Sequence, residues 1–579
     1  MGLDFRNANS LWAAVLLETW YRLGLRLAII SPGSRSTPLT VASAQHPGVE
    51  AIAILDERSA AFFALGNAKR TGQPVLLICT SGTAAANFYP AVIEASLSQV
   101  PLLVLSADRP PELRHCRAGQ TIDQIKLYGH YPNWQAELAT VDITSDRLCY
   151  LRQMAVQAWE RSLCPQPGVV HLNVPLREPL APLSDPDRLT QIAEFDTEAF
   201  FAAIAPPLLP QPSLPWPEAW QAERRGLIVA GLAHPLQPEA YCRAVAELAA
   251  GLGWPVLTDA LSPLRHQAAL NPYLVSTYDL ILRNSKQAAN LVPDWVIQIG
   301  ELPTSKILRA WLQRFDPPRW LVATGAESLD PLQGRVIHLP VSVENLEPRS
   351  RIAQASSLYL AQWLAIATQA RQLLDQELQA LEQLNDSQVA ALLPQVLPEA
   401  TPLLIANSSP VRDVEYFWPL NSRRLQPFVN RGANGIDGTL STALGLAHRS
   451  DRPTVLLTGD LALLHDTNGF LSARQLVGSL TIVLINNQGG GIFEWLAIAA
   501  FDPPFEEYFA TPQAVDFRQL CATYGIDYHL IADEQQFRQL LAALPRQGVR
   551  LLEVRTERRR EAQWRQDLFT RLAAALPAV

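Results

Sequence analysis

The sequence predicts an α/β protein of three domains, each a doubly wound parallel sheet. The chain has 579 residues, and single hydrophobic cores stop growing near about 250–300 residues, so one compact core is excluded. Short apolar, β-branched runs alternate with helical patterns, which is typical of parallel sheets covered on both faces. Hydrophobic residues make up 48% of the chain and charged residues 18%, so each domain can bury its own core.

Residues 1–180 form the first predicted domain, because apolar strands and amphipathic helices alternate along them. The predicted strands are Leu27–Ile30, Ala51–Leu55, Val75–Cys79 and Leu102–Ser106. The predicted helices are Leu11–Leu23, Pro38–Gln45, Ser59–Thr71 and Ala84–Gln99.

Two further blocks follow a proline-rich connector at residues 181–225, where Pro cannot continue a helix or a central strand. The central block, residues 226–355, has predicted strands at Gly226–Val229, Trp254–Thr258, Trp295–Ile299, Trp320–Ala323 and Arg335–Leu339. The last block, residues 356–579, begins with a predicted helical segment at 356–395. Its predicted strands are Leu403–Ala406, Gln426–Asn430, Thr454–Thr458, Thr481–Ile485 and Arg550–Val554. The first and last blocks look alike in layout.

The charge balance excludes a globally cationic surface. The chain has 47 Lys and Arg against 55 Asp and Glu, for a formal net charge of −8, so neither nucleic acid nor an anionic membrane is an expected partner. Only four of the cations are lysines. The N-terminus lacks a secretory signal, and no run of about 18 apolar residues follows, so a cytoplasmic location is expected. The six cysteines show no metal-ligand spacing and are expected to be reduced and mostly in the core.

The sharpest chemical signal lies at the ends of two predicted strands in the last block. Gly459-Asp460 follows one strand and Asn486-Asn487 follows the next. Because the carboxyl ends of adjacent parallel strands meet at one edge of a sheet, Asp460 and Asn487 can face one another. With the carbonyl of Gly489, they would supply half of the octahedral oxygen cage that Mg²⁺ prefers. The pattern favours a diphosphate bridged by Mg²⁺, with Mn²⁺ as an alternative.

Two ordinary strand-to-helix turns are the competing interpretation, in which Gly, Asp and Asn supply turn geometry and helix caps. A lone Gly-Asp pair would favour that interpretation. The two motifs together, followed by three glycines at 489–491, favour a functional site instead. The pair resembles the diphosphate-binding signature of thiamin diphosphate enzymes, which begins with Gly-Asp and closes with Asn-Asn.

Such enzymes also need a carboxylate that hydrogen-bonds N1′ of the cofactor's aminopyrimidine, and Glu57 is the candidate. Glu57 stands between an apolar strand and an Ala- and Phe-rich helix, so it is expected to be largely desolvated, with a raised pKa. The run Asp56–Ser59 alone is also typical of a helix start. The Glu-bearing block precedes the diphosphate block, which is the order of the decarboxylase-type members rather than the transketolase type.

Short sequence stretches in all three blocks are similar to those of one family of these enzymes. The matching stretches are Ser31–Leu39, Ser106–Leu113, Gly119–Asp123, Thr304–Lys306, Asn407–Arg412 and Asn430–Gly438. They resemble the 2-succinyl-5-enolpyruvyl-6-hydroxy-3-cyclohexene-1-carboxylate synthase (MenD) family. The resemblance implies a thiamin diphosphate- and Mg²⁺-dependent enzyme of menaquinone or phylloquinone biosynthesis. It would decarboxylate 2-oxoglutarate and add the succinyl carbanion to isochorismate in a 1,4-addition.

The resemblance also implies a set of site residues, with Glu57 as the catalytic one. The implied cofactor-binding residues are Gly435, Ile436, Gly459, Asp460, Asn487 and Gly489, and the metal ligands are Asp460, Asn487 and Gly489. The implied substrate-binding residues are Ser34, Arg35, Arg109, Gln120, Lys306, Ser408, Arg412, Arg431, Ile492 and Phe493. Both substrates are dicarboxylates, and Arg binds carboxylates in bidentate geometry. The family implies a homo-oligomer, with a dimer as the minimum and a tetramer as the family expectation.

Other interpretations stay open at the level of sequence. Each arginine has a structural explanation: Arg35 could lie on a surface turn, and Arg412 could pair with Asp413 or Glu415. The position after Lys306 is often basic in the family, and here it is Ile307. An acetohydroxyacid synthase-type carboligase is the main alternative enzyme, and a nucleotide-dependent dehydrogenase and an inactive homologue are others. The central block has no GxGxxG after a strand, so no FAD or NAD is expected.

Overall fold

Three six-stranded parallel sheets form the framework of the computed structural model, which describes residues 3–185, 195–207, 212–221, 225–325, 329–348 and 357–577. The first sheet contains β1 (Leu27–Ile30), β2 (Glu50–Ala53), β3 (Val75–Cys79), β4 (Leu102–Asp108), β5 (Trp134–Glu137) and β6 (Val169–Pro175). The second contains β8 (Gly226–Ala230), β9 (Val256–Thr258), β10 (Leu274–Val275), β11 (Trp295–Ile299), β12 (Arg319–Val322) and β13 (Val336–Leu339). The third contains β15 (Pro402–Ile405), β16 (Gln426–Phe428), β17 (Thr454–Gly459), β18 (Ser479–Asn486), β19 (Asp527–Leu530) and β20 (Gly548–Arg555).

The strand orders confirm the predicted fold class. The first sheet runs β2-β1-β3-β4-β6-β5 and the third runs β16-β15-β17-β18-β20-β19, which is the same order, so the likeness between the first and last blocks is confirmed. The central sheet runs β10-β9-β8-β11-β12-β13, the order of doubly wound dinucleotide-binding folds. In such sheets ligands bind beyond the carboxyl ends of the strands, beside the point where the strand order reverses.

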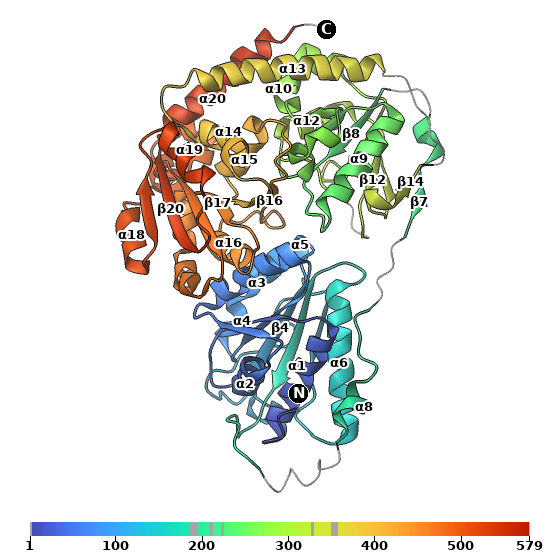
Figure 1. Ribbon diagram of the computed structural model, residues 1–579, viewed down its shortest axis with the longest axis vertical. Coiled ribbons are helices and arrows are strands. Elements are labelled where there is room, and N and C mark those ends of the chain that lie inside the picture. The colour runs from blue at the N-terminus through green and yellow to red at the C-terminus, as the bar shows by residue number, and fades with distance from the viewer. Residues whose placement is uncertain are drawn as a thin grey trace. The chain divides into compact units, whose positions relative to one another are not determined.

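The described chain divides into two compact units. One unit holds the first sheet with residues 430–449 and 465–477, and the other holds the central and third sheets. The first unit contains α1 (Ala8–Leu23), α2 (Thr37–Gln45), α3 (Glu57–Thr71), α4 (Thr83–Asn87), α5 (Tyr89–Leu97), α6 (Ser145–Leu163), α8 (Thr197–Phe201) and α16 (Thr439–Ala447). Helices α1 and α6 pack together, as do α3 and α5, and Figure 1 shows the two pairs on opposite faces of the first sheet.

Helices α3 and α16 cross at van der Waals contact within the first unit. A Cβ on Gly66 would lie 2.0 Å from the carbonyl oxygen of Thr442, and a Cβ on Gly445 would lie 2.0 Å from that of Phe63. Glycine is therefore required at both positions. This crossing attaches residues 430–449, which follow β16 in sequence, to the helix that begins at Glu57.

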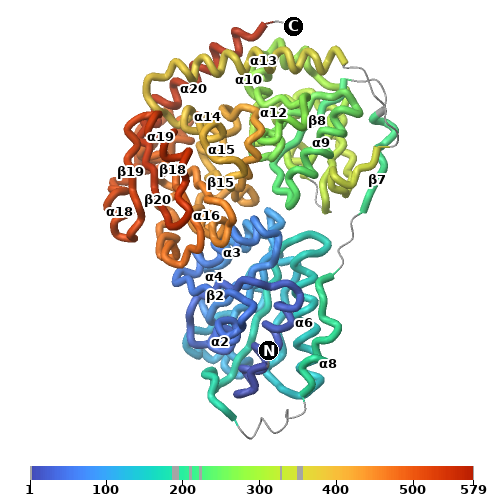
Figure 2. Tube along the Cα trace, in the orientation of Figure 1, coloured from blue at the N-terminus to red at the C-terminus, as the bar shows by residue number. Residues whose placement is uncertain are grey.

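The second unit contains two sheets with a shared helical layer. Its helices are α9 (Pro238–Leu252), α10 (Tyr278–Arg283), α11 (Ser285–Asn290), α12 (Lys306–Phe315), α13 (Leu358–Gln379), α14 (Asp386–Val396), α15 (Ser409–Phe417), α18 (Phe517–Tyr524), α19 (Glu534–Ala542) and α20 (Arg558–Ala575), and α17 (Asp460–His465) begins in this unit. Figure 2 shows α13 lying along α20, and buried residues of both join those of α10 and α12 in one apolar cluster.

Several sequence predictions need correction. The single helix predicted over Ala84–Gln99 is two helices, α4 and α5, which meet at Phe88 ahead of Pro90, because Pro cannot donate the backbone N–H that a continuous helix needs there. The predicted connector has short elements in its described parts: α8, and β7 (Leu214–Pro215), which pairs with β14 (Leu346–Glu347). The domain limits stay a prediction.

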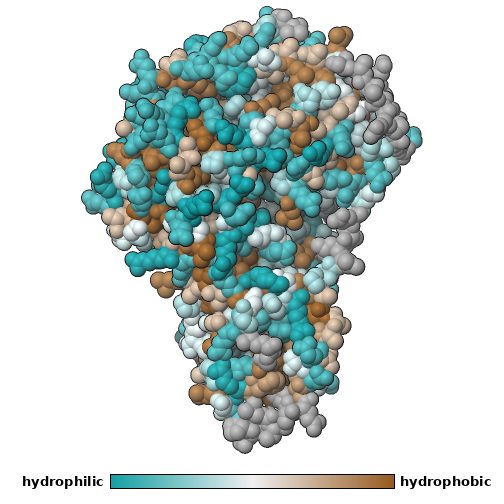
Figure 3. All heavy atoms as spheres, viewed as in Figure 1, coloured by the Kyte–Doolittle hydropathy of each residue, from teal (hydrophilic) through white to brown (hydrophobic). Residues whose placement is uncertain are grey.

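The surface and the cysteines agree in part with expectation. Among the described residues no helix is long and apolar enough to cross a membrane. The face drawn in Figure 3 mixes hydrophilic and hydrophobic residues without a continuous apolar band. All six cysteines are free thiols, as predicted, but only Cys79, Cys242 and Cys521 are buried.

Candidate active site

The residues predicted to hold a metal-bound diphosphate lie at the carboxyl ends of β17 and β18. These strands pair in parallel, with Gly459 opposite Ile485, so the prediction that the two motifs leave adjacent strands is confirmed. Asp460 is buried, and its Oδ2 accepts the backbone N–H of Gly489 at 2.8 Å. Gly489 has a φ of 132°, and a Cβ there would lie 2.3 Å from the carbonyl oxygen of Ala510. Glycine is therefore required for this approach.

The electrostatics of this edge fit a divalent cation. Burial raises the pKa of Asp460 to about 6, the N–H groups of Gly489 and Leu461 oppose the shift, and the charge of Asp386 adds to it. Asn487 donates Nδ2 to Asp386 at 3.3 Å, which leaves its Oδ1 to coordinate or accept. Within the described residues no group of three or more His, Cys, Asp or Glu is arranged to hold a metal. The predicted set of one carboxylate, one amide oxygen and the Gly489 carbonyl consists of the oxygen donors that Mg²⁺ prefers, and its role as a metal site stays a prediction.

Glu57 is the first residue of α3, at the carboxyl end of β2. Its neighbour Asp56 caps the helix by accepting the N–H of Ser59 at 3.1 Å. The Glu57 carboxylate is close enough to Cys79 that its charge adds to burial in raising the pKa of that thiol. Glu57 itself is half-buried, and the extent to which its carboxyl is desolvated stays a prediction.

Two arginines meet at the carboxyl edge of the first sheet. Arg35, in the loop after β1, is 7% exposed, and its Nη1 donates to the carbonyl of Leu176 at 2.9 Å while Nη2 pairs with Glu178 at 3.3 Å. Arg109 directly follows β4. Burial lowers the pKa of Arg35, and the positive charge of Arg109 lowers it further. The structure therefore brings Arg35 and Arg109 into electrostatic range, and Arg35 is not on an exposed turn.

Gln120 and Ser34 lie at the same edge. Gln120 donates Nε2 to the carbonyl of Ser81 at 2.9 Å, and Ser81 Oγ donates to the carbonyl of Gln120 at 2.9 Å, so the two loops hold each other. Arg109 donates Nη2 to the carbonyl of Gly119 at 2.9 Å, directly beside Gln120. Ser34 is exposed on the loop that carries Arg35. Four predicted substrate residues therefore lie on neighbouring loops of the first sheet, and a fifth, Arg431, belongs to the same unit.

In the second unit, Ser408 and Arg412 form a local pair at the end of β15. Ser408 has a φ of 73°, which a residue other than glycine rarely adopts and which is common at functional sites. Its carbonyl accepts Nη1 of Arg412 at 2.6 Å. The carboxylates that could have paired with Arg412 bind other arginines: Asp413 pairs with Arg565 and Glu415 with Arg265. No carboxylate pairs with Arg412 in the described part of the chain, and burial lowers its pKa.

Lys306 belongs to the second unit. It is the first residue of α12 and is exposed, after the N-cap Ser305, whose Oγ donates to Asp279. The following residue, Ile307, packs against the apolar cluster between α10, α12 and α20. Lys306 is therefore the one cation of the matched motif here, and the packing of Ile307 holds the first turn of its helix in place.

The remaining predicted residues lie on two loops. Arg431, Gly435 and Ile436 belong to the loop between β16 and α16, and the Ile436 carbonyl accepts Oγ1 of Thr439 at 2.8 Å. Ile492 and Phe493 follow the glycines after β18 and are half-buried, with Phe493 edge-on to Phe509 at a centroid distance of 5.8 Å. Their role as an apolar wall stays a prediction.

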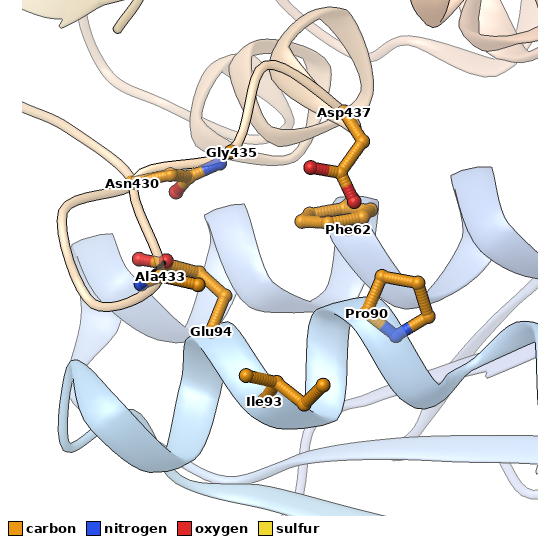
Figure 4. A pocket seen from close by; sticks show the side chains of 8 residues that line it. All are labelled: Phe62, Pro90, Ile93, Glu94, Asn430, Ala433, Gly435 and Asp437. Atoms are coloured by element: carbon orange, nitrogen blue, oxygen red, sulfur yellow. Dashed lines mark hydrogen bonds between the residues drawn. The ribbon is translucent and has the colours of Figure 1, made fainter.

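A cavity of about 180 Å³ that the sequence did not predict lies beside the loop at 430–438. Figure 4 shows its lining residues, which come from α3, α5 and the loop: Phe62, Pro90, Ile93, Glu94, Asn430, Ala433, Gly435 and Asp437. Glu94 was missed because its role depends on tertiary contacts. Its one sequence signal is an acid within the apolar helix Tyr89–Leu97.

A buried acidic group near the diphosphate edge predicts a pH effect on stability. Burial raises the pKa of Asp413 to about 7. The positive charge of Arg565 lowers this pKa, and the negative charge of Asp386 offsets part of that effect. Burial also raises the pKa of Glu561. A raised folded-state pKa contributes stability below the unfolded pKa and loses it as pH rises through the folded value. We therefore expect the cofactor-free protein to melt at lower temperature as pH rises from about 6 to about 8.

The control for this pH effect is Asp413→Asn, measured by calorimetry across the same pH range. One titrating group changes the free energy of unfolding by up to about 1.4 kcal/mol per pH unit, so the variant should show a flatter profile. An unchanged profile in Asp413→Asn would assign the effect to other groups.

Family models match the three sheets in chain order. Residues 12–127 match the N-terminal TPP binding domain of thiamine pyrophosphate enzymes, residues 210–405 match their middle domain, and residues 413–554 match their C-terminal TPP binding domain. The X-ray structure of a Mycobacterium smegmatis protein described as a thiamin diphosphate-dependent enzyme superposes with a TM-score of 0.66 at 16% identity, covering 94% of this chain and 99% of that one. The fold is therefore that of thiamin diphosphate enzymes.

Curated relatives show which family of thiamine pyrophosphate enzymes the chain resembles in sequence. A 2-succinyl-5-enolpyruvyl-6-hydroxy-3-cyclohexene-1-carboxylate synthase of Gloeothece citriformis is 57% identical over 573 residues, covering 97% of this chain and 98% of the relative. The synthase of the same name from Microcystis aeruginosa is 56% identical over 572 residues, covering 97% and 99%. These relatives do not favour the acetohydroxyacid synthase alternative. The chain therefore belongs to the thiamine pyrophosphate enzymes and, among them, to the 2-succinyl-5-enolpyruvyl-6-hydroxy-3-cyclohexene-1-carboxylate synthase family.

Proposed function

We propose that this chain decarboxylates 2-oxoglutarate and adds the remaining four-carbon acyl unit to isochorismate by 1,4-addition. The product is 2-succinyl-5-enolpyruvyl-6-hydroxy-3-cyclohexene-1-carboxylate, on the route to menaquinone or phylloquinone. Carbon dioxide leaves 2-oxoglutarate, and a new carbon–carbon bond joins the acyl carbon to the ring. The names of the curated relatives support this reaction.

The electrostatics around Arg35 support the proposal. Burial and the positive charge of Arg109 lower the pKa of Arg35, and they outweigh the opposing charges of Glu178 and Asp108. The Nε of Arg35 is also buried without a hydrogen-bond partner in the described chain. Glu178 already pairs with Arg35, and a further anion beside Arg109 would stabilise the two neighbouring cations more. A dicarboxylate such as isochorismate supplies that anion and can bind each guanidinium in bidentate geometry.

The remaining roles follow from placement at the strand ends. Thiamin diphosphate, when bound, supplies the carbon nucleophile for decarboxylation and carries the acyl unit. Asp460, Asn487 and the Gly489 carbonyl would hold Mg²⁺ or Mn²⁺ against the diphosphate. Glu57 would hold and return the proton at N1′ of the aminopyrimidine. We also propose that the chain forms a homo-oligomer, at least a dimer, and the family leads us to expect a tetramer. Sedimentation equilibrium measures the mass of the assembly and tests this.

The cations are expected to divide between the two half-reactions. Arg412 and Arg431 should bind the distal carboxylate of 2-oxoglutarate, whereas Arg35 and Arg109, with Lys306 and Gln120, should receive isochorismate. A hydrogen bond to a charged group contributes roughly 1.5–3 kcal/mol, or about 10–10²-fold in rate or affinity. Arg412→Ala and Arg431→Ala should therefore slow CO₂ release from 2-oxoglutarate in a single turnover without isochorismate. Arg35→Ala and Arg109→Ala should slow only product formation.

The matched control is Arg474→Ala, because Arg474 is exposed and outside every predicted site motif. It should leave both half-reactions unchanged. Equal damage to CO₂ release in all four site variants would contradict the division and favour one anion site that both substrates visit in turn.

The proposed reaction is tested by leaving out one component of the assay at a time. Loss of isochorismate, followed by its absorbance, should require thiamin diphosphate, Mg²⁺ and 2-oxoglutarate together. Loss that continues without 2-oxoglutarate would contradict the proposal.

A further inference from the structure

Glu94 is a buried carboxylate that binds the loop between β16 and α16. Its Oε2 accepts the backbone N–H of Ala433 at 2.7 Å, and its Oε1 accepts that of Gly432 at 3.1 Å. Oε1 also accepts Oγ of Ser98 at 2.6 Å and lies 3.3 Å from Nζ of Lys69. The side chains of Glu94 and Lys69 are each 3% exposed. Figure 4 shows Glu94 reaching from its helix to the loop beside Ala433.

This arrangement fixes the loop backbone. Two consecutive N–H groups can point at one carboxylate only in a narrow range of backbone conformations, as in other anion-binding turns. A buried carboxylate is costly unless it is paired and hydrogen-bonded, so Glu94 favours the one loop conformation that presents both donors.

The rest of the loop is held as closely. Asn430 donates Nδ2 to Oγ1 of Thr442 at 3.0 Å at the start of the loop. At its end Gly438 has a φ of 64°, and a Cβ there would lie 2.0 Å from the ring of Phe62. A Cβ on Gly432 would lie 2.8 Å from Cβ of Leu97, so α5 and the loop are in close contact where Glu94 binds.

The segment that Glu94 holds carries predicted ligand contacts on both sides. Arg431 directly precedes Gly432, and Gly435 and Ile436 follow Ala433. A carboxylate this close to a site for dicarboxylates would repel them if it were unpaired. Lys69, one of four lysines in the chain, supplies the opposite charge, so the loop is organised without added negative charge.

We propose that Glu94, paired with Lys69, is a positioning residue that holds Gly432 and Ala433 so that Arg431 and Ile436 keep the geometry needed for 2-oxoglutarate and thiamin diphosphate. The identity of the ligands rests on the proposed function. The positioning of the loop rests on the contacts of Glu94 alone.

Glu94→Gln tests this role, because Gln has one acceptor oxygen and cannot serve the donors on both sides. Amide hydrogen exchange, read by mass spectrometry on peptides covering 430–438, should be about 10-fold faster at Gly432 and Ala433 in the cofactor-free variant. In the assembled enzyme, KM for 2-oxoglutarate should rise about 10-fold, with a smaller change in kcat.

Glu18→Gln is the matched control. Glu18 is also buried in the first unit, on α1, and pairs with Arg22 at 2.6 Å and with His46 at 3.1 Å without binding the loop. It should change neither the exchange at 430–438 nor KM. Lys69→Met should reproduce the effect of Glu94→Gln on exchange.

Gly432→Ala gives a second test that removes no charge, since the added methyl would displace the loop from α5. It should raise KM as Glu94→Gln does, and it decides the question if Glu94→Gln does not fold. Unchanged exchange in folded Glu94→Gln, or faster exchange with unchanged KM and unchanged thiamin diphosphate affinity, would overturn the proposal. If the wild-type protein does not turn over the two substrates, the proposed function fails, while exchange and thiamin diphosphate titration still decide the role of Glu94.

Discussion

Glu57→Gln is expected to fold and to bind thiamin diphosphate but to lose about 10²–10⁴-fold of its turnover. The amide cannot hold and return a proton at N1′, whereas it keeps the size of the carboxyl and the first helical position of α3. The measurement is kcat with both substrates at saturating cofactor, together with a calorimetric titration of the cofactor.

The matched control is Asp56→Asn, one residue earlier. Asn caps helices as well as Asp does, so this variant removes a neighbouring negative charge while keeping the cap that Asp56 provides. It should keep kcat within a few-fold of wild type. Near wild-type turnover in Glu57→Gln would remove Glu57 from the mechanism, and equal loss in both variants would point to a general charge effect.

Asp460→Ala is expected to abolish the Mg²⁺-dependent part of thiamin diphosphate binding. Asp460 is the only charged member of the proposed ligand set, and burial already raises its pKa to about 6. A bound cation should lower this pKa again and keep the carboxylate ionised over a wider pH range. Without the Asp460 carboxylate, Asn487 and the Gly489 carbonyl would face the diphosphate with no cation between them. Calorimetric titration with and without Mg²⁺ measures the effect.

Asp451→Ala serves as the control, because Asp451 is exposed in the turn before β17. It should bind cofactor and Mg²⁺ as wild type does. If Asp460→Ala retains the same cofactor affinity with and without Mg²⁺ as wild type, the Gly-Asp and Asn-Asn motifs serve only as turns.

Several strands were predictable from sequence because they are mostly apolar runs. β1 and β3 are wholly apolar, β11 is apolar except for Gln298, and all three occupy the predicted residues. The strands that sequence reasoning missed include the edge strands β5, β10 and β19, and also β6, which lies between β4 and β5 and is buried along its whole length. Edge strands are short and partly polar here, as in Trp134–Glu137 and Asp527–Leu530, so pairing with a neighbour, rather than their own pattern, defines them.

Site residues were predictable where chain order decides their position. Asp460 and Asn487 follow strands that pair, and Arg35 and Arg109 follow strands of one sheet. Burial was not predictable in the same way: Arg35 could have lain on a surface turn and is buried. The pairing of Glu94 with residues 432 and 433 joins positions more than 300 apart in sequence, and no local pattern encodes such a contact.

The most direct test of the proposed reaction is the mass of its product. Purified protein with thiamin diphosphate, Mg²⁺, isochorismate and uniformly carbon-13-labelled 2-oxoglutarate should give a product in which four labelled carbons are joined to the unlabelled isochorismate skeleton, with the fifth released as labelled CO₂. Labelled CO₂ without that adduct, or an adduct that retains all five labelled carbons, would contradict the proposed decarboxylation and 1,4-addition.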